Sequence, residues 1–250
     1  MTICENQGCE IEIPSVSDTV TIATDDWPYL YLEKRSIPLQ YWIVLLVVVG
    51  IAWFSTRRVF DNARNINSHF FFLGGAFLLI EFKSITELAL LFGSTWIVNS
   101  VAVSAVLMMV LFANLIVSRL ARINMNTLYL LLAVSLLISF LTPLDHLLAY
   151  GILARAVGAG ILLGMPIFFS SAIFATSLKG TNDVVGAFAS NFLGSALGGI
   201  LEYGSLAFGI KSLYLIGAIL YIVSWMTSSQ GRLLPVWISN RLNTQSSPTE

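Results

Sequence analysis

The stretch HFFFLGGAFLLIEFKSITELALLFGSTWIVN, residues 69–99, is apolar over a length that suits a membrane crossing, yet it contains Glu81, Lys83 and Glu87. A transmembrane helix needs about 20 residues to cross a hydrocarbon core of roughly 30 Å. A charged side chain near the bilayer centre costs on the order of 3 kcal/mol, so such residues usually face the interior of a bundle or a wet cavity. The stretch therefore predicts a membrane-embedded helix bundle with a polar interior.

These three charges do not share one face of the predicted helix. Lys83 and Glu87 are four residues apart, which places them on one side of a helix within reach of each other. Glu81 points elsewhere, so we expect its partner on another helix. Two explanations are open: the charges form a structural clamp, or they form a site for a transported or bound ligand.

The composition of the whole chain also indicates a membrane protein. Of its 250 residues 56% are hydrophobic and 11% are charged, whereas soluble domains are about one quarter charged. The apolar runs are too long for barrel strands, so we expect an all-α polytopic transmembrane bundle of about seven helices. The predicted helices span 40–56, 69–93, 96–118, 126–143, 147–178, 184–204 and 207–227. The fifth is too long for a straight crossing, so we expect it to tilt or to break near Pro166.

The chain divides into three parts: a soluble N-terminal arm with an interfacial linker (1–38), a transmembrane helical domain (39–228) and a polar C-terminal tail (229–250). Alternating residues within 1–24 predict one or two short strands. Residues 1–33 contain seven acids and no Lys or Arg, which makes a nucleic-acid partner unlikely in this class of protein. The acidic and aromatic linker, with Asp25, Asp26 and Trp27, is expected at the level of the lipid headgroups, where Trp and Tyr concentrate.

Basic residues in the loops set the expected orientation, because cytoplasmic loops are rich in Lys and Arg. Those after the first, third, fifth and seventh predicted helices fall on one side; they are Arg57, Arg58, Arg64, Arg119, Arg122, Lys179, Arg232 and Arg241. This predicts a membrane protein with its N-terminus outside and its C-terminus in the cytoplasm. The exceptions are Lys34, Arg35 and Lys211. Cys4 and Cys9 are either bridged or free thiols, and no His or further Cys lies near them in sequence to complete a zinc site.

The sixth predicted helix carries small and polar residues at intervals of three or four, which places them on one face. Gly194 and Gly198 form a GxxxG motif that lets another helix approach closely. Asn191 and Glu202 on the same face either serve packing or line a polar cavity. Arg155 is expected to pair with Glu81 or Glu202, or to snorkel to the interface. The predicted intramembrane polar cluster consists of Glu81, Lys83, Glu87, Asn99, Arg155, Asn191 and Glu202.

Signatures of enzyme chemistry are absent from the sequence. It has no GxSxG elbow, no HExxH pair, no Walker loop and no spacing typical of metal ligands. We therefore expect no cofactor, no metal and no catalytic residue on this chain. An intramembrane acid–base pair of Glu81 and Glu87 is the weakest of the hypotheses.

Four segments together resemble the membrane region of bacterial spermidine synthase-like proteins. They are DDWPYLYL (25–32), FLLIEFK (77–83), LFGSTWIVN (91–99) and the run from Asn191 to Tyr203. In that family a soluble aminopropyltransferase-type domain is joined to a multi-helix membrane domain. The sequence of this chain has no counterpart of the soluble domain. The resemblance therefore implies a membrane partner, or the membrane half, of a synthase-like protein.

Two functions follow as expectations. The first is a non-catalytic integral membrane subunit or anchor that works with a synthase-like or other protein in a complex, and that admits a small polar or cationic molecule. The alternative is a transporter of a small cation such as a polyamine, with Glu81, Glu87 and Glu202 facing the cation. The sequence shows no internal repeat and no matched pair of broken helices, which counts against the transporter.

Overall fold

The computed structural model describes residues 24, 26–29, 32, 35–62, 66–93, 95–120 and 124–228. The predicted strands before Thr24, the state of Cys4 and Cys9, and the polar tail 229–250 lie outside the described residues.

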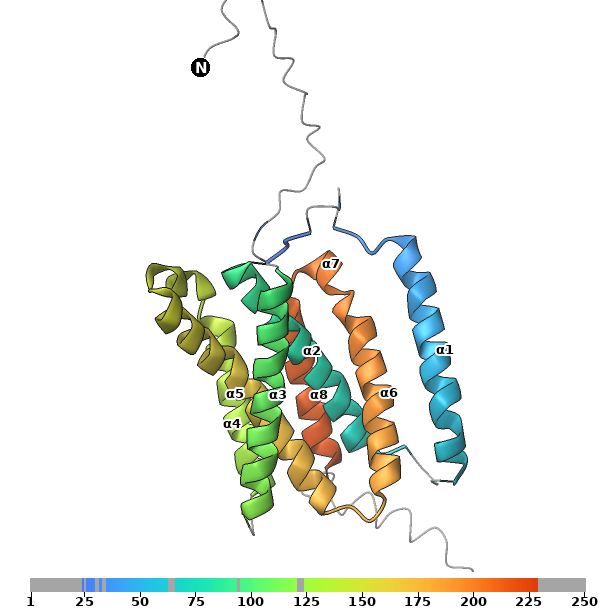
Figure 1. The fold of residues 1–250 in the computed structure, drawn as a ribbon. Coiled ribbons are helices and arrows are strands. Elements are labelled where there is room, and N and C mark those ends of the chain that lie inside the picture. The colour runs from blue at the N-terminus through green and yellow to red at the C-terminus, as the bar shows by residue number, and fades with distance from the viewer. Residues whose placement is uncertain are drawn as a thin grey trace, which may run out of the picture.

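The described part of the chain is an all-α helical bundle, which confirms the predicted fold class (Figure 1). Its elements are α1 (Leu39–Asn62), α2 (Ser68–Phe92), α3 (Trp96–Arg119), α4 (Met125–Leu141), the 3₁₀-helix η1 (Leu144–Ala149), α5 (Ile152–Lys179), α6 (Val184–Glu202), the short α7 (Ser205–Phe208) and α8 (Ser212–Thr227). Side-chain caps begin four of these helices by accepting a backbone N–H of the first turn; they are Asn67, Thr95, Asn124 and Asp183.

Two predicted helices are divided in the structure. The expected helix 147–178 begins instead as η1 and restarts at Ile152 after Gly151. The expected helix 207–227 is separated into α7 and α8 by Gly209, whose φ of 87° lies in the region that favours glycine. Both divisions lie at the same end of the bundle, the end that α7 and η1 occupy in Figure 1. It is called the arm end below, because Asp26 and Trp27 of the N-terminal arm bind there.

The predicted break at Pro166 does not occur, because α5 continues through this proline. A proline has no N–H, so the carbonyl four residues earlier loses its helical partner. Here the Ser139 hydroxyl of α4 donates to that carbonyl, on Leu162, over 2.7 Å. The neighbouring helix thus satisfies the freed group, as membrane helices require. The expected tilt is present instead: α5 crosses the bundle obliquely in Figure 1.

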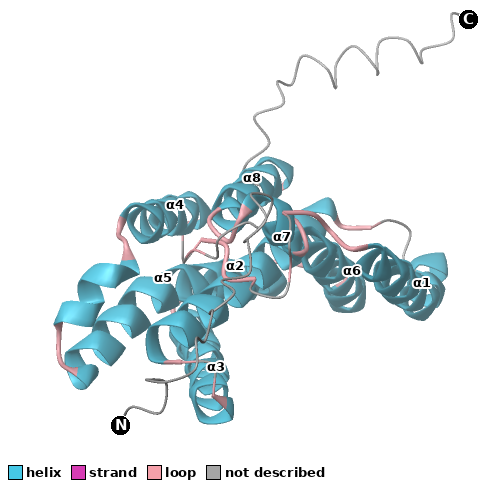
Figure 2. Ribbon diagram, turned by 90° about the horizontal axis from the view of Figure 1, so that it is seen from above, coloured by secondary structure: helices cyan, strands magenta, loops and turns pink. Residues whose placement is uncertain are grey.

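The stretch singled out in the sequence forms the centre of the bundle. Seen from above, α2 is surrounded by α3, α5, α6 and α8 (Figure 2). It supplies Leu73, Ala76, Leu79 and Ile80 to the buried apolar core. By contrast, α1 lies outside and packs on α6.

Glycines allow α2 and α6 to approach closely. A Cβ added at Gly194 would lie 1.7 Å from the carbonyl oxygen of Phe71, and one added at Gly198 would lie 2.6 Å from that of Gly75. Only a residue without a side chain fits at such distances, which is how GxxxG motifs join helices in membranes. Larger residues at Gly194 would separate α2 from α6.

Three helical stretches of the described chain are long and apolar enough to cross a membrane by length and composition: Val98–Arg119, Ile152–Lys179 and Val184–Phe208. Three shorter apolar helices, Leu39–Ser55, Met125–Leu141 and Ser212–Thr227, lie beside them. Large apolar side chains cover the outside of the bundle; Leu46, Leu107 and Leu130, for example, are 69%, 61% and 64% exposed. An apolar surface of this extent indicates a protein surrounded by lipid.

Candidate binding site at the arm end of the bundle

Lys83 is the most deeply buried charged group of the described chain, since its side chain has no exposed surface. It forms an ion pair with Glu87, one turn further along α2, as the spacing of four residues suggested. Its ammonium also lies 3.7 Å from the ring centroid of Tyr214 on α8. An ammonium removed from water needs such partners, and an aromatic face supplies part of the lost stabilisation.

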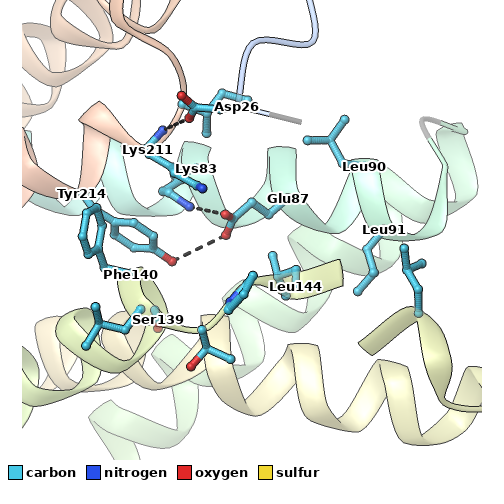
Figure 3. Close-up of a pocket in the computed structure, with 15 residues that line it drawn as sticks. Asp26, Lys83, Glu87, Leu90, Leu91, Ser139, Phe140, Leu144, Lys211 and Tyr214 are labelled. Atoms are coloured by element: carbon cyan, nitrogen blue, oxygen red, sulfur yellow. Dashed lines mark hydrogen bonds and ion pairs between the residues drawn. The ribbon is translucent and has the colours of Figure 1, made fainter. Parts of the chain in front are cut away.

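Glu87 connects the same pair to α8 by a second contact. The Tyr214 hydroxyl donates to Glu87 Oε2 over 3.5 Å, while Oε1 accepts from Lys83 (Figure 3). Two helices whose contacting residues are 127 positions apart are therefore held by one charged group.

The described part of the arm docks beside this pair, on the end of the bundle. Trp27 is fully buried, and its indole N–H donates to the Leu206 carbonyl over 2.7 Å. The Asp26 carbonyl accepts from the Ile210 N–H, and its carboxylate accepts from the Lys211 N–H, each over 2.8 Å. The buried indole and the backbone bonds together make this a specific attachment to the turn between α7 and α8.

The rest of the described arm strengthens the attachment. The Tyr29 hydroxyl lies 2.6 Å from Ser205 Oγ, and burial raises the pKa of Tyr29 above its ordinary value. Arg35 lies over the indole of Trp27, with 5.6 Å between its guanidinium carbon and the ring centroid. Gly209 is required where the arm touches the turn, because a Cβ there would lie 2.4 Å from an oxygen of the Asp26 carboxylate.

A cavity of about 220 Å³ lies between the arm, α2, the end of α4 and the start of α8. Two acids and two bases line it, Asp26, Glu87, Lys83 and Lys211, beside the Tyr214 ring (Figure 3). Apolar residues of α2, α4 and η1 complete its wall. The site is therefore polar, of balanced charge, and large enough for a small group rather than a whole drug-sized ligand.

The structure does not bring the seven residues of the predicted polar cluster together. Asn191 donates to the Phe70 carbonyl over 3.3 Å, in the contact between α6 and α2. Asn99 is exposed in the first turn of α3. Glu81 and Glu202 are half-buried, and no ion pair of either is found among the described residues. Only Lys83 and Glu87 share a site.

The expected pairing of Arg155 with Glu81 or Glu202 is likewise not found in the described part of the chain. Its guanidinium instead donates to the carbonyls of Leu148 and Tyr150, over 3.0 and 3.3 Å. These carbonyls are left unpaired where η1 ends, so the arginine closes the connection from η1 to α5.

A second polar region, missed in the sequence, lies at the opposite end of the bundle. His69 at the start of α2 contacts Ser177 of α5 and Ser224 of α8, and Tyr129 of α4 contacts Ser224. In the sequence, only the presence of a histidine and several serines within otherwise apolar helices pointed to this region. These residues meet because of how the helices pack, which the spacing of residues within one helix does not predict.

Among the described residues, no group of three or more His, Cys, Asp or Glu side chains is close enough to hold a metal ion. Comparison of the chain with protein-family models, with curated proteins and with solved structures returned no match.

Proposed function

We propose that this chain is a non-catalytic integral membrane subunit or anchor that holds a partner protein at the arm end of the bundle. The docking of Asp26 and Trp27 on the turn between α7 and α8 carries the proposal. A buried indole and hydrogen bonds to the backbone hold the arm in one position on the bundle. A partner protein that binds the arm is thereby held in a fixed position too. A loosely attached linker would not need these contacts.

The Lys83–Glu87 pair supports the same function as a clamp. It holds α2 to Tyr214, two residues after the start of α8 at Ser212, and the residues just before that start bind Asp26. The clamp thus stabilises the surface on which the arm rests. This assigns a structural purpose to charges that would otherwise be costly in a membrane.

The class of partner and the orientation rest on sequence features. The resemblance to the membrane region of spermidine synthase-like proteins favours a synthase-like partner, in a bacterial inner membrane. The helices α1, α3, α5 and α8 all end on the side away from the arm (Figure 1), and Arg57, Arg119 and Lys179 lie near three of these ends. The distribution of basic residues favours a cytoplasmic location for that side, here called the basic end, and an external location for the arm.

Native mass spectrometry of the chain, extracted from its own membranes in mild detergent, tests the proposal. We expect a second polypeptide in stoichiometric amount. Trp27→Ala should release it, because the arm loses its buried anchor. The matched control is Trp42→Ala, which alters a half-exposed tryptophan of α1 outside the dock. A wild-type chain found alone, or only with copies of itself, would contradict the proposal.

A transporter of a small cation is the second candidate, and the carboxylates of Asp26 and Glu87 in the cavity favour it. Lys83 and Lys211 count against it, because with two lysines beside the two carboxylates the cavity has no net negative charge to attract a polycation. Calorimetric titration of the purified chain with spermidine separates the two functions. If the wild type binds spermidine and Glu87→Gln does not, while the helicity of the variant is retained, transport is favoured. If the wild type does not bind spermidine, the subunit function is favoured.

A further inference from the structure

An apolar groove of about 540 Å³ runs between α4 and α8. The two helices touch at both of its ends. At the basic end the Trp225 indole donates to Asn126 Oδ1 over 3.0 Å, and at the arm end the rings of Phe140 and Tyr214 lie 6.3 Å apart. Between these contacts the helices leave a gap lined mainly by leucine, isoleucine, alanine and tyrosine side chains.

The groove faces outward, where the outer surface of the bundle is apolar. Leu137 of α4 and Leu215 and Ile222 of α8 line it, and each is 56% exposed. A volume of 540 Å³ lies within the range of about 300–1,000 Å³ usual for sites that hold small molecules. Its length along two membrane helices and its lack of charge fit a hydrocarbon chain.

The groove meets the polar cavity at the arm end, because Phe140 and Tyr214 line both. The apolar groove along two helices thus adjoins a cavity with charged groups near the helix ends. The two hollows together suit an amphiphile: the cavity with charged groups suits a polar headgroup, and the apolar groove suits a hydrocarbon chain.

The charged residues of the cavity indicate which kind of headgroup it can bind. The ammonium of Lys211 is exposed, and no partner for it is found in the described ranges. The carboxylates of Asp26 and Glu87 accept one or two hydrogen bonds each, although a carboxylate can accept about four. The cavity therefore offers a cation for a phosphate and two carboxylates for an ammonium.

We propose that this composite site binds one phosphatidylethanolamine molecule, with its headgroup in the cavity and one acyl chain in the groove between α4 and α8. The phosphate pairs with Lys211, and the primary ammonium donates to Glu87 and Asp26. An anionic headgroup can use the lysines of the cavity but has no ammonium to donate to its two carboxylates. A trimethylammonium headgroup has no N–H to donate, so it loses the charge-assisted hydrogen bonds.

The test is native mass spectrometry of the purified full chain with equimolar palmitoyl-oleoyl phosphatidylethanolamine, phosphatidylcholine and phosphatidylglycerol. We expect the phosphatidylethanolamine adduct to exceed each of the others by about tenfold, the effect of one charge-assisted hydrogen bond. Equal adducts of the three lipids, or a preference for either competitor, would overturn the proposal.

Two variants locate the site. Lys211→Ala removes an exposed side chain but keeps the backbone N–H that binds Asp26, and should lower the adducts of all three phospholipids, because each of them carries the phosphate that pairs with Lys211. Ala133→Phe fills the groove and should reduce the adduct several-fold. Ala105→Phe, at an exposed position of α3 outside both hollows, is the matched control and should bind as the wild type does. If the adducts of Lys211→Ala are as large as those of the wild type, or if Ala133→Phe binds as well as Ala105→Phe, the site is wrong.

Discussion

The two ends of the bundle handle buried polarity in opposite ways. At the arm end, Lys83 and Glu87 are charged, meet the ring and hydroxyl of Tyr214, and border a cavity. At the basic end, His69, Tyr129 and Ser224 are buried and Ser177 is half-buried. The carboxylates at the arm end can accept further hydrogen bonds from a molecule in the cavity, whereas the polar groups at the basic end have little capacity left.

The hydrogen bonds of His69 show how closed the second region is. Its Nδ1 lies 2.9 Å from the Ser224 carbonyl, which can only accept, so this nitrogen carries the proton. Its Nε2 then accepts from the Ser177 hydroxyl over 2.7 Å. Both ring nitrogens of a neutral imidazole are thereby satisfied. The contrast suggests that the basic end holds helices together, while the arm end also binds.

The largest expected effect comes from breaking the charged pair. Glu87→Ala should lower the free energy of unfolding by about 3–5 kcal/mol, because it leaves the buried Lys83 ammonium without its counterion. Unfolding in a series of SDS mole fractions, followed by circular dichroism, measures the change.

The double variant Lys83→Met/Glu87→Leu is the control for that result, since it removes both charges together. It should recover most of the lost stability, because apolar residues of similar volume often replace a buried pair at little cost. If the double variant is as unstable as Glu87→Ala, the pair is not a self-contained clamp.

The next effect concerns the neutral region. His69→Ala should cost about 2–3 kcal/mol, since it removes a large buried side chain and the hydrogen-bond partner of the Ser177 hydroxyl; the Ser224 carbonyl keeps its bonds from Thr227 and Ser228. Binding of phosphatidylethanolamine and of the partner protein should stay unchanged, as judged by native mass spectrometry of the folded fraction. Loss of either ligand in this variant would remove the distinction between the two ends.

A neutral bond at the arm end should behave like those at the basic end. Ser139→Ala leaves the Leu162 carbonyl unpaired beside Pro166, and should cost about 1–2 kcal/mol in the same unfolding assay. Ser139→Thr keeps a hydroxyl and serves as the comparison. An unchanged stability in Ser139→Ala would show that another group, such as water, satisfies that carbonyl.

The smallest effect is expected for Tyr129→Phe, which removes one hydroxyl from the basic end. Ser224 Oγ keeps its bond to the His69 carbonyl, so the loss should be about 1 kcal/mol. A double-mutant cycle with Ser224→Ala measures how strongly the two hydroxyls interact. A coupling as large as that of Lys83 with Glu87 would mean that the neutral region is as cooperative as the charged one.

Local patterns predicted the local features of the fold. The apolar runs located α2, α3, α4 and α6 closely, and the spacing of Lys83 and Glu87 predicted their contact. The positions of the helices and this contact both depend on residues close together in sequence. Within a few turns, the geometry of a helix determines which side chains are neighbours.

Long-range features were not predictable in this way. Tyr214 joins the charged pair from 127 residues beyond Glu87, and Asp26 joins the cavity from the arm. Arg155 was expected to pair with Glu81 or Glu202 or to snorkel, but it donates to the carbonyls of Leu148 and Tyr150 at the end of η1, a helix that the sequence did not predict. The fifth predicted helix was expected to tilt or to break near Pro166; it tilts, and Ser139 of another helix satisfies the Leu162 carbonyl.

The most direct test compares the two ends in one experiment: native mass spectrometry of wild type, Trp27→Ala and His69→Ala, each extracted from its own membranes in the same detergent. The account predicts that a second polypeptide accompanies the wild type and the folded His69→Ala chain and is missing from Trp27→Ala. A wild-type chain without a second polypeptide, or its equal loss in both variants, would contradict the account.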